Sequence, residues 1–304
     1  MSIIKPILVL GASGYIGSQL VSALLEKGYL VRASARSSAN LKRFSWAKDS
    51  RVETIETNVL DKQSLQNACQ GCDAVYYLIH SMNSYNKDFS QADRLAAKNM
   101  IESASSTGVR RIIYLGGLGE EENSLSKHLR SRMEVLYILH SGKVPVTSLR
   151  AAMIIGKGSI SFEIFRSLIN RFPILITPTW VSTESQPIAV TNVIHYLAAC
   201  LGSELTVDQV FDIGGPDILS YEDLVNIYTQ EAGLKKRRII TLPILTSTVS
   251  SFCVGLVTPY PMYIARPLVE GLKNRVVCQD NRIGDIIPQN LLNCQEAIRM
   301  AISL

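Results

Sequence analysis

Charge, cysteine and targeting signals are scarce in this sequence, and each shortage excludes a class of protein. Only 19% of the 304 residues are charged and 47% are hydrophobic, which excludes a disordered or fibrous chain and leaves enough apolar material for one or two domains. The six cysteines are too scattered for a disulfide framework. Cys69 and Cys72 form a C-x-x-C motif, but no second pair follows at zinc spacing, so we interpret them as ordinary loop thiols.

Signals for export, for nucleic-acid binding and for several catalytic classes are also missing. Residues 1–6 contain neither a charged n-region nor a long apolar h-region, so we expect a cytoplasmic protein. The net charge is only +5 and the longest basic run is Lys235 to Arg238, which argues against a nucleic-acid partner. The motifs G-x-S-x-G, G-K-[ST] and H-E-x-x-H are absent. His140 and His195 lack cysteine or carboxylate companions at ligand spacing, so no metal site is expected.

An uncharged segment at 242–258 follows the basic run and raises the question of membrane contact. It carries four hydroxyl side chains between Thr246 and Ser250, with prolines at Pro243 and Pro259. We therefore predict a buried or groove-lining helix; peripheral membrane contact is the less favoured alternative.

What the sequence does contain is an alternation of short apolar runs and helical patterns. Strands are predicted at 6–11, 30–35, 52–57, 74–79, 111–115 and 146–150. Between them, a helical pattern begins at Ile16 and stops at Gly28, and helices are predicted at 62–69, 91–107 and 126–139. Such alternation is typical of an α/β fold with a doubly wound parallel sheet.

The rhythm becomes irregular after residue 150. We expect a helix at 161–171, a Pro/Thr-rich loop at 173–179, a short run at 188–190 opening a helix at 193–201, and a strand at 210–213. The remaining residues are expected to be mainly helical. The predicted division is a nucleotide-binding domain at 1–215, with 156–185 on its substrate side, and a smaller C-terminal substrate or partner domain at 216–304.

A glycine motif stands where the first strand turns into the first helix. Gly11-Ala12-Ser13-Gly14-Tyr15-Ile16-Gly17 would let the backbone turn tightly and approach a pyrophosphate at the positive end of the helix. The spacing G-x-x-G-x-x-G is one residue longer than the common dinucleotide fingerprint. The predicted contacts of this loop are Gly11, Ser13, Gly14, Tyr15, Ile16 and Gly17.

The second strand lacks the acid that accepts ribose hydroxyls in an NAD site. No Asp or Glu occurs between Glu26 and Asp49, whereas six basic residues do. We therefore predict NADP(H) in preference to NAD(H), with Arg36 holding the 2′-phosphate. Further along the cofactor we expect Asn58 and Val59 at the adenine edge, and Leu78, Ile79 and His80 beneath the cofactor, because both segments stand at carboxyl ends of strands three and four.

These residues carry a resemblance to the extended or atypical short-chain dehydrogenase/reductases. The resemblance rests on the glycine motif, Arg36, N-V-L-D at 58–61, A-x-N-M-I-E-S-A-x-x-x-G-V-R-R-I-I-Y-L at 97–115, and the later segments 145–152, 186–193 and 211–221. Y-L-I-H-S-M at 77–82 and H-L-R-S-R at 128–132 are most similar to the bacterial YbjT-like NAD(P)-binding proteins. Those are related to the NmrA-like sensors and the complex I 39 kDa subunit. The resemblance implies a Rossmann fold and a bound dinucleotide.

Active members of that family use a Ser, Tyr, Lys set, with Tyr-x-x-x-Lys on one helix face. None of the twelve tyrosines here has lysine four residues later. By position, Gly116-Gly117 replaces the serine end of strand five, His128 replaces the tyrosine and Arg132 the lysine. His128 could move a proton and Arg132 could hold an anionic group; alternatively both residues only cap the helix or touch the cofactor ribose.

Two hypotheses of function follow. The first is an NADP(H)-binding protein without the catalytic set, serving a redox-sensing, structural or regulatory role with an unknown small molecule or protein partner in its cleft. The alternative is an NADP-dependent oxidoreductase or nucleoside-diphosphate-sugar epimerase/dehydratase that uses His128 as proton donor or acceptor.

Overall fold

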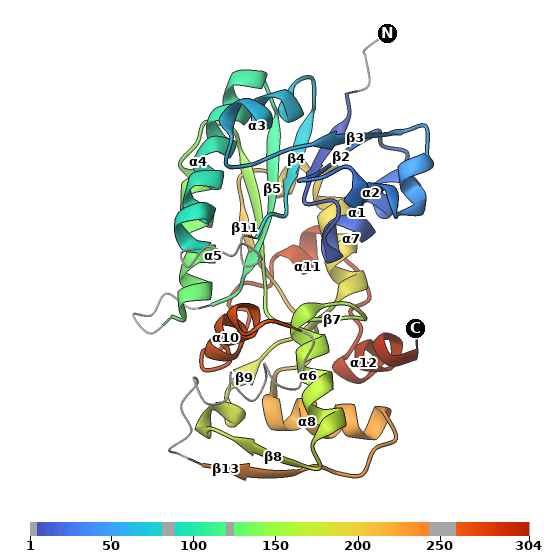
Figure 1. The fold of residues 1–304 in the computed structure, drawn as a ribbon, viewed down its shortest axis with the longest axis vertical. Helices are drawn as coiled ribbons and strands as arrows, with labels where there is room; N and C mark the ends of the chain where they lie inside the picture. The colour runs from blue at the N-terminus through green and yellow to red at the C-terminus, as the bar shows by residue number, and fades with distance from the viewer. Residues whose placement is uncertain (1–4, 81–88, 120–124, 243–259, 304) are drawn as a thin grey trace.

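The computed structural model describes residues 5–80, 89–119, 125–242 and 260–303 (Figure 1). The segment singled out at 242–258 lies outside these residues beyond Leu242. The centre of the fold is a seven-stranded sheet in the order β11-β6-β5-β4-β1-β2-β3, and every neighbouring pair is parallel. The chain starts at β1 and winds outward in both directions, which confirms the predicted doubly wound sheet.

The strands of this sheet fall where the apolar runs predicted them. They are β1 (Ile7–Leu10), β2 (Val31–Ala35), β3 (Val52–Glu56), β4 (Ala74–Tyr77), β5 (Arg111–Gly117), β6 (Val146–Ala151) and β11 (Val210–Ile213). All four residues of β1 and of β4 are buried, because helices cover both faces of the sheet there.

Helices pack on the two faces in separate groups (Figure 1). On one face, α1 (Tyr15–Glu26) and α7 (Val190–Cys200) enclose an apolar cluster that includes Leu20, Leu24 and Val193, with Ile283 of α11 (Ile283–Ile286). On the other face, α3 (Lys62–Cys69), α4 (Phe89–Thr107) and α5 (Lys127–His140) enclose a second cluster. The short elements α2 (Ala39–Lys42) and η1 (Ser45–Lys48) follow β2.

The region beyond β6 contains more strand than predicted. It comprises β7 (Ile154–Ile155), α6 (Ile160–Arg171), β8 (Ile174–Thr177), η3 (Thr179–Ser182), β9 (Glu184–Ser185), β10 (Ile188–Ala189), η4 (Glu204–Thr206), β12 (Leu219–Ser220), α8 (Tyr221–Glu231), β13 (Arg238–Thr241), α10 (Met262–Gly271) and α12 (Cys294–Ser303). The loop predicted at 173–179 was wrong, because each residue of β8 pairs in parallel with the residue of β13 that lies 64 positions later in the chain. A distant partner of this kind leaves no local pattern in the sequence.

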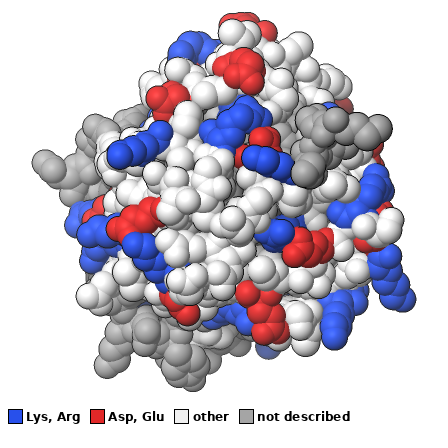
Figure 2. Space-filling model, turned by 90° about the horizontal axis from the view of Figure 1, so that it is seen from above, with Lys and Arg blue, Asp and Glu red and all other residues white. Residues whose placement is uncertain are grey.

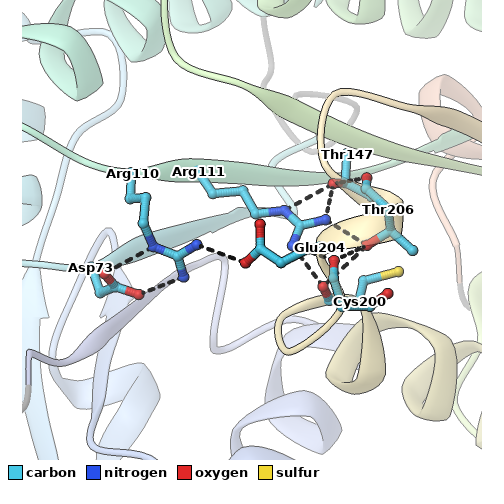
Figure 3. A network of polar contacts seen from close by, with 8 residues as sticks. Asp73, Arg110, Arg111, Thr147, Cys200, Glu204 and Thr206 are labelled. Carbon is cyan, nitrogen blue, oxygen red and sulfur yellow. Dashed lines mark hydrogen bonds and ion pairs between the residues drawn. The ribbon is translucent and has the colours of Figure 1, made fainter.

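The amino edge of the sheet is closed by two adjacent arginines (Figure 3). Arg111 is fully buried and donates to the hydroxyls of Thr147 and Thr206 and to the carbonyls of Cys200 and Ser203. Arg110 pairs with Asp73 at 3.0 Å and with Glu204 at 3.6 Å. These contacts fasten the connection after α7 to the start of β5.

Charges are mixed on the face shown in Figure 2, where acidic and basic side chains alternate across white surface. Among the described residues no helix combines the length and apolarity needed to span a bilayer. Within the same ranges no three His, Cys, Asp or Glu side chains converge as metal ligands would.

Candidate functional site

The glycine loop joins β1 to α1 in a conformation that its glycines make possible. Gly11 has φ of +87°, and a Cβ there would lie 3.1 Å from the carbonyl oxygen of Leu78. A Cβ at Gly17 would lie 2.2 Å from the carbonyl oxygen of Gly11, so no side chain fits at the start of the helix. The loop is therefore a tight turn without side chains at the start of α1, which is the geometry typical of loops that bind a pyrophosphate.

Tyr15 of this loop extends away to meet the segment after β7. Its hydroxyl lies in the space that a side chain at Gly156 would fill, and its ring lies against Gly158. Burial raises the pKa of Tyr15, so the phenol stays protonated. The contact fixes the loop against the part of the chain that leads into α6.

Basic side chains gather where β2 ends, as predicted, but their roles differ. Arg36 is exposed, and no hydrogen bond or ion pair of its side chain occurs in the described ranges. Arg43 donates to the carbonyl of Ser13 at 3.0 Å and lies 4.8 Å from the Phe44 ring. Arg32 faces elsewhere, because it pairs with Glu53 at 2.7 Å. Sequence reasoning counted Arg43 among the bases without seeing that it reaches the glycine loop.

An acid also approaches this end of the sheet from a neighbouring strand. Glu56, the last residue of β3, accepts the backbone N–H of Ser38 at 2.7 Å. That hydrogen bond holds the pKa of Glu56 below its ordinary value. The carboxylate is thus bound to the residue before α2. The sequence did not predict an acid here, because Glu56 belongs to another strand and lies outside the acid-free stretch between Glu26 and Asp49.

The segment after β3 is held in a turn by its own side chains. Asn58 is exposed, and its side-chain oxygen accepts the N–H of Leu60 at 3.1 Å. Asn99 of α4 donates to the carbonyl of Val59 at 3.0 Å. Asn99 thereby positions the two residues predicted at the adenine edge, and its place in the A-x-N segment was the only sequence signal for that role.

Arg132 links the ends of two central strands. Its guanidinium donates to the carbonyl of Ile79 after β4 at 3.1 Å and to the carbonyl of Leu115 in β5. The same group lies 4.8 Å above the ring of Tyr114, whose hydroxyl donates to the Arg132 carbonyl at 3.1 Å. Arg132 is buried and places a fixed positive charge beneath the carboxyl edge.

Two imidazoles lie beside this charge. The ring centroids of His80 and His128 are 4.9 Å apart, and Nδ1 of His80 lies 3.8 Å from Oδ2 of Asp93. Both nitrogens of His80 and Nδ1 of His128 are shielded from solvent without a hydrogen-bond partner. Burial lowers the pKa of His80, and Asp93 opposes that shift. Burial, followed by the charges of His80 and Arg132, lowers the pKa of His128 much further.

A polar hollow of about 440 Å³ lies next to this cluster, between α4 and α5. It is lined by Ser90, Arg94, Lys127, Arg130, Ser131 and Glu134. Arg94 and Glu134 pair across it at 2.8 Å. Ser131 also donates to Asp93 at 3.0 Å, so one hydroxyl joins the hollow to the buried carboxylate.

The C-x-x-C thiols are far less reactive than free thiols. Burial raises the pKa of Cys69 to about 12 and of Cys72 to about 11. Cys69 is the last residue of α3 and Cys72 lies in the loop before β4, so the prediction of loop thiols was wrong for Cys69 and confirmed for Cys72; both side chains are buried. Neither thiol has the depressed pKa of a redox motif.

The family model described as NAD(P)H-binding matches residues 11–143, which include the glycine loop, Arg36 and both imidazoles. Residues 11–143, less than half of the chain, therefore resemble NAD(P)H-binding proteins, and the parallel sheet is Rossmann-like. The match is consistent with the resemblance to the atypical short-chain dehydrogenase/reductases.

Sequence relatives of this Rossmann protein include plant reductases. Cinnamoyl-CoA reductase 1 of Petunia hybrida is 34% identical over 116 residues, which is 36% of this chain and only 34% of that protein. Photosystem II assembly factor Ycf39 of Cyanophora paradoxa is 25% identical over 244 residues, 78% of this chain and 72% of that one.

Solved structures share the whole fold. A nucleoside-diphosphate-sugar epimerase of Staphylococcus aureus superimposes with a TM-score of 0.76 at 15% identity, covering 97% of this chain and 99% of that one. The triphenylmethane reductase of Citrobacter sp., complexed with NADP(H), gives 0.76 at 18% identity with the same coverage. The NADPH-dependent quinone oxidoreductase of Escherichia coli gives 0.75 at 15% identity, covering 96% and 98%.

Proposed function

We propose that this protein is an NADP(H)-dependent oxidoreductase acting on a small organic carbonyl or quinone-type compound, with His128 as the proton-exchanging group. The observation that carries the proposal is the shielded imidazole pair at the carboxyl edge, because unpartnered buried polar atoms cost free energy that a purely structural core would avoid. This pair is the reason for ranking the catalytic hypothesis above the regulatory one.

The nucleotide fits the residues present. A Cβ at Gly11, Gly14 or Gly17 would come within 3.1 Å of a backbone oxygen, so only glycine allows this tight turn, while Arg36 and Arg43 offer cationic groups for a 2′-phosphate. Relatives that are reductases, and the similar solved structures complexed with NADP(H) or NADPH, support this assignment. When bound, the nicotinamide supplies or accepts a hydride.

The chain's own contribution is to hold charge and move a proton. Arg132 keeps β4 and β5 at a fixed spacing and keeps positive charge near the imidazoles. Since that charge and burial lower the pKa of His128, its ring is neutral at neutral pH and can accept a proton from a substrate hydroxyl. Arg132 itself shuttles no proton, because its guanidinium is engaged with two carbonyls.

A regulatory role is the second candidate. One relative, which matches over 78% of this chain, is the photosystem II assembly factor Ycf39, and the Tyr-x-x-x-Lys pair is absent from the sequence. In that case the bound nucleotide would set the shape of the cleft for a partner without turning over.

Nicotinamide absorbance distinguishes the two candidates. NADPH-loaded protein is mixed with a panel of aldehydes, ketones and quinones, and oxidation at 340 nm is followed for the wild type and for His128→Ala. We expect turnover with at least one compound and a loss of roughly 100-fold or more in the variant. Nucleotide binding without oxidation across the panel would favour the regulatory role.

A further inference from the structure

Two neighbouring imidazoles and a carboxylate lie together at this end of the sheet. Nδ1 and Nε2 of His80 and Nδ1 of His128 are shielded from solvent without a hydrogen-bond partner among the described residues. Asp93 lies 3.8 Å from Nδ1 of His80 and is only 1% exposed. Because the two rings have centroids 4.9 Å apart, the carboxylate and both imidazoles form one contiguous group.

We propose that Asp93, His80 and His128 form a single proton-transfer chain in which His128 exchanges a proton with a substrate oxygen and Asp93 is a positioning residue for His80. The proposal rests on the proposed function, since it adds two residues, Asp93 and His80, to the site in which His128 exchanges a proton. Asp93 comes from α4, His80 follows β4 and His128 belongs to α5, so the chain exists only in the folded protein.

The carboxylate sets the tautomers. A negative charge beside Nδ1 of His80 favours a proton on that nitrogen, which leaves Nε2 as an acceptor toward His128. A proton on Nδ1 of His128 then leaves its Nε2 as the base. Nδ1 of His80 lies 3.8 Å from Asp93, and within the described ranges neither nitrogen of His80 nor Nδ1 of His128 makes a hydrogen bond; catalytic hydrogen bonds are often long until a substrate is bound.

The proton balance is simple. In the oxidative direction the substrate O–H bond would break, its proton would go to Nε2 of His128, and the carbon would lose a hydride that a bound nicotinamide nucleotide could accept. In the reductive direction the imidazolium form of His128 would return that proton from Nε2 to the carbonyl oxygen. Ser131 offers a route to solvent, because it contacts Asp93 and lines the polar hollow.

The charged and titratable groups around His80 and His128 lead us to expect pKa shifts of opposite sign in two variants. His80 and Arg132 lower the pKa of His128, whereas Asp93 raises the pKa of both imidazoles. Tyr77 and Tyr114 lie near the carboxylate and stay protonated, since burial raises their pKa values. Removing His80 should therefore raise the pKa of His128, and removing the Asp93 charge should lower the pKa of His80.

The test is an NMR titration of the four histidines, labelled at Cε1, in the wild type, His80→Gln and Asp93→Asn. We expect the His128 midpoint to move up in His80→Gln and the His80 midpoint to move down in Asp93→Asn, with His140 and His195 unmoved as internal references. If the midpoints of His80 and His128 are the same in both variants as in the wild type, the proton-transfer chain is wrong. If Asp93→Asn does not fold, the His128 midpoint in His80→Gln is the test.

Oxidation of NADPH in the same preparations separates this proposal from the proposed function. Coupled titrations without substrate-dependent oxidation would reject the oxidoreductase and leave the acid–base chain standing. Oxidation whose pH profile is unchanged in both variants would reject the chain and leave the oxidoreductase standing. A profile that shifts with the midpoints supports both.

Discussion

The phenol oxygen of Tyr15 occupies the place of a side chain at Gly156: a Cβ on that glycine would lie 2.1 Å from the oxygen. The two residues are far apart in sequence, and one belongs to the glycine loop while the other follows β7. Their contact couples the glycine loop to the segment that leads into α6.

We predict that Gly156→Ala disturbs this coupling. The new methyl group would also lie 2.7 Å from Cγ1 of Val190, so both neighbours must move, at a cost of about 1–3 kcal/mol of overpacking. Thermal unfolding should shift downward and NADPH affinity, measured by calorimetry, should fall. Gly284→Ala is the control, because a Cβ at Gly284 meets no atom within 4 Å. Equal stability of the two variants would contradict the packing argument.

Nucleotide selectivity tests the two arginines at the end of β2. Arg36→Ala should weaken NADPH binding by roughly 10- to 100-fold and leave NADH binding nearly unchanged, since only the former carries a 2′-phosphate. Arg43→Ala should weaken both nucleotides, because Arg43 also holds the carbonyl of Ser13 in the glycine loop. Fluorescence titration measures both affinities.

Lys48→Ala is the matched control for this experiment. Lys48 is exposed and belongs to the same acid-free stretch, but no contact joins it to the glycine loop in the described residues. Unchanged NADPH selectivity in Arg36→Ala would show that the phosphate assignment is wrong.

Stability should fall on the acidic side of neutrality. His80, His128 and His140 all have pKa values lowered by burial, whereas in the unfolded chain a histidine titrates near ~6.5. Above that pH both states are neutral and nothing changes. Below it the unfolded chain binds protons that the fold excludes, so the free energy of unfolding decreases until the lowered folded pKa values are reached.

Urea unfolding at pH 7.5, 6.5 and 5.5 measures this slope, which is at most ~1.4 kcal/mol per pH unit for each imidazole. Replacing both His80 and His128 with Gln should make the free energy of unfolding depend less on pH below neutrality than His140→Gln does, because two histidines with lowered pKa values are removed at once. An unchanged pH dependence in the double variant would contradict this account.

The buried Arg111 should matter more for stability than its neighbour. Arg111→Met would leave the hydroxyls of Thr147 and Thr206 and the carbonyls of Cys200 and Ser203 without their donor, and we expect a loss of roughly 3–5 kcal/mol. Arg110→Met removes only exposed ion pairs, for which the loss is about 0.2–1 kcal/mol. Denaturant unfolding of both variants gives the comparison, and similar losses would show that burial of Arg111 is not the decisive factor.

The sequence by itself determined the sheet and the nucleotide loop, because those features depend on local patterns. An apolar run such as Ile7–Leu10 predicts a strand buried on both faces, and three glycines at fixed spacing predict a backbone that approaches a phosphate. The same locality explains the successful prediction of the main helices up to α5.

The tertiary structure alone decided which side chains meet. Asp93 approaches His80 from α4, Glu56 reaches Ser38 from β3, Arg43 returns to Ser13, and β8 finds its partner in β13. None of these pairs is close in sequence, and a period of two or of 3.6 residues carries no information about a partner on another element. The charge of each buried imidazole depends on such partners, so the chemistry of this edge could be read only from the folded chain.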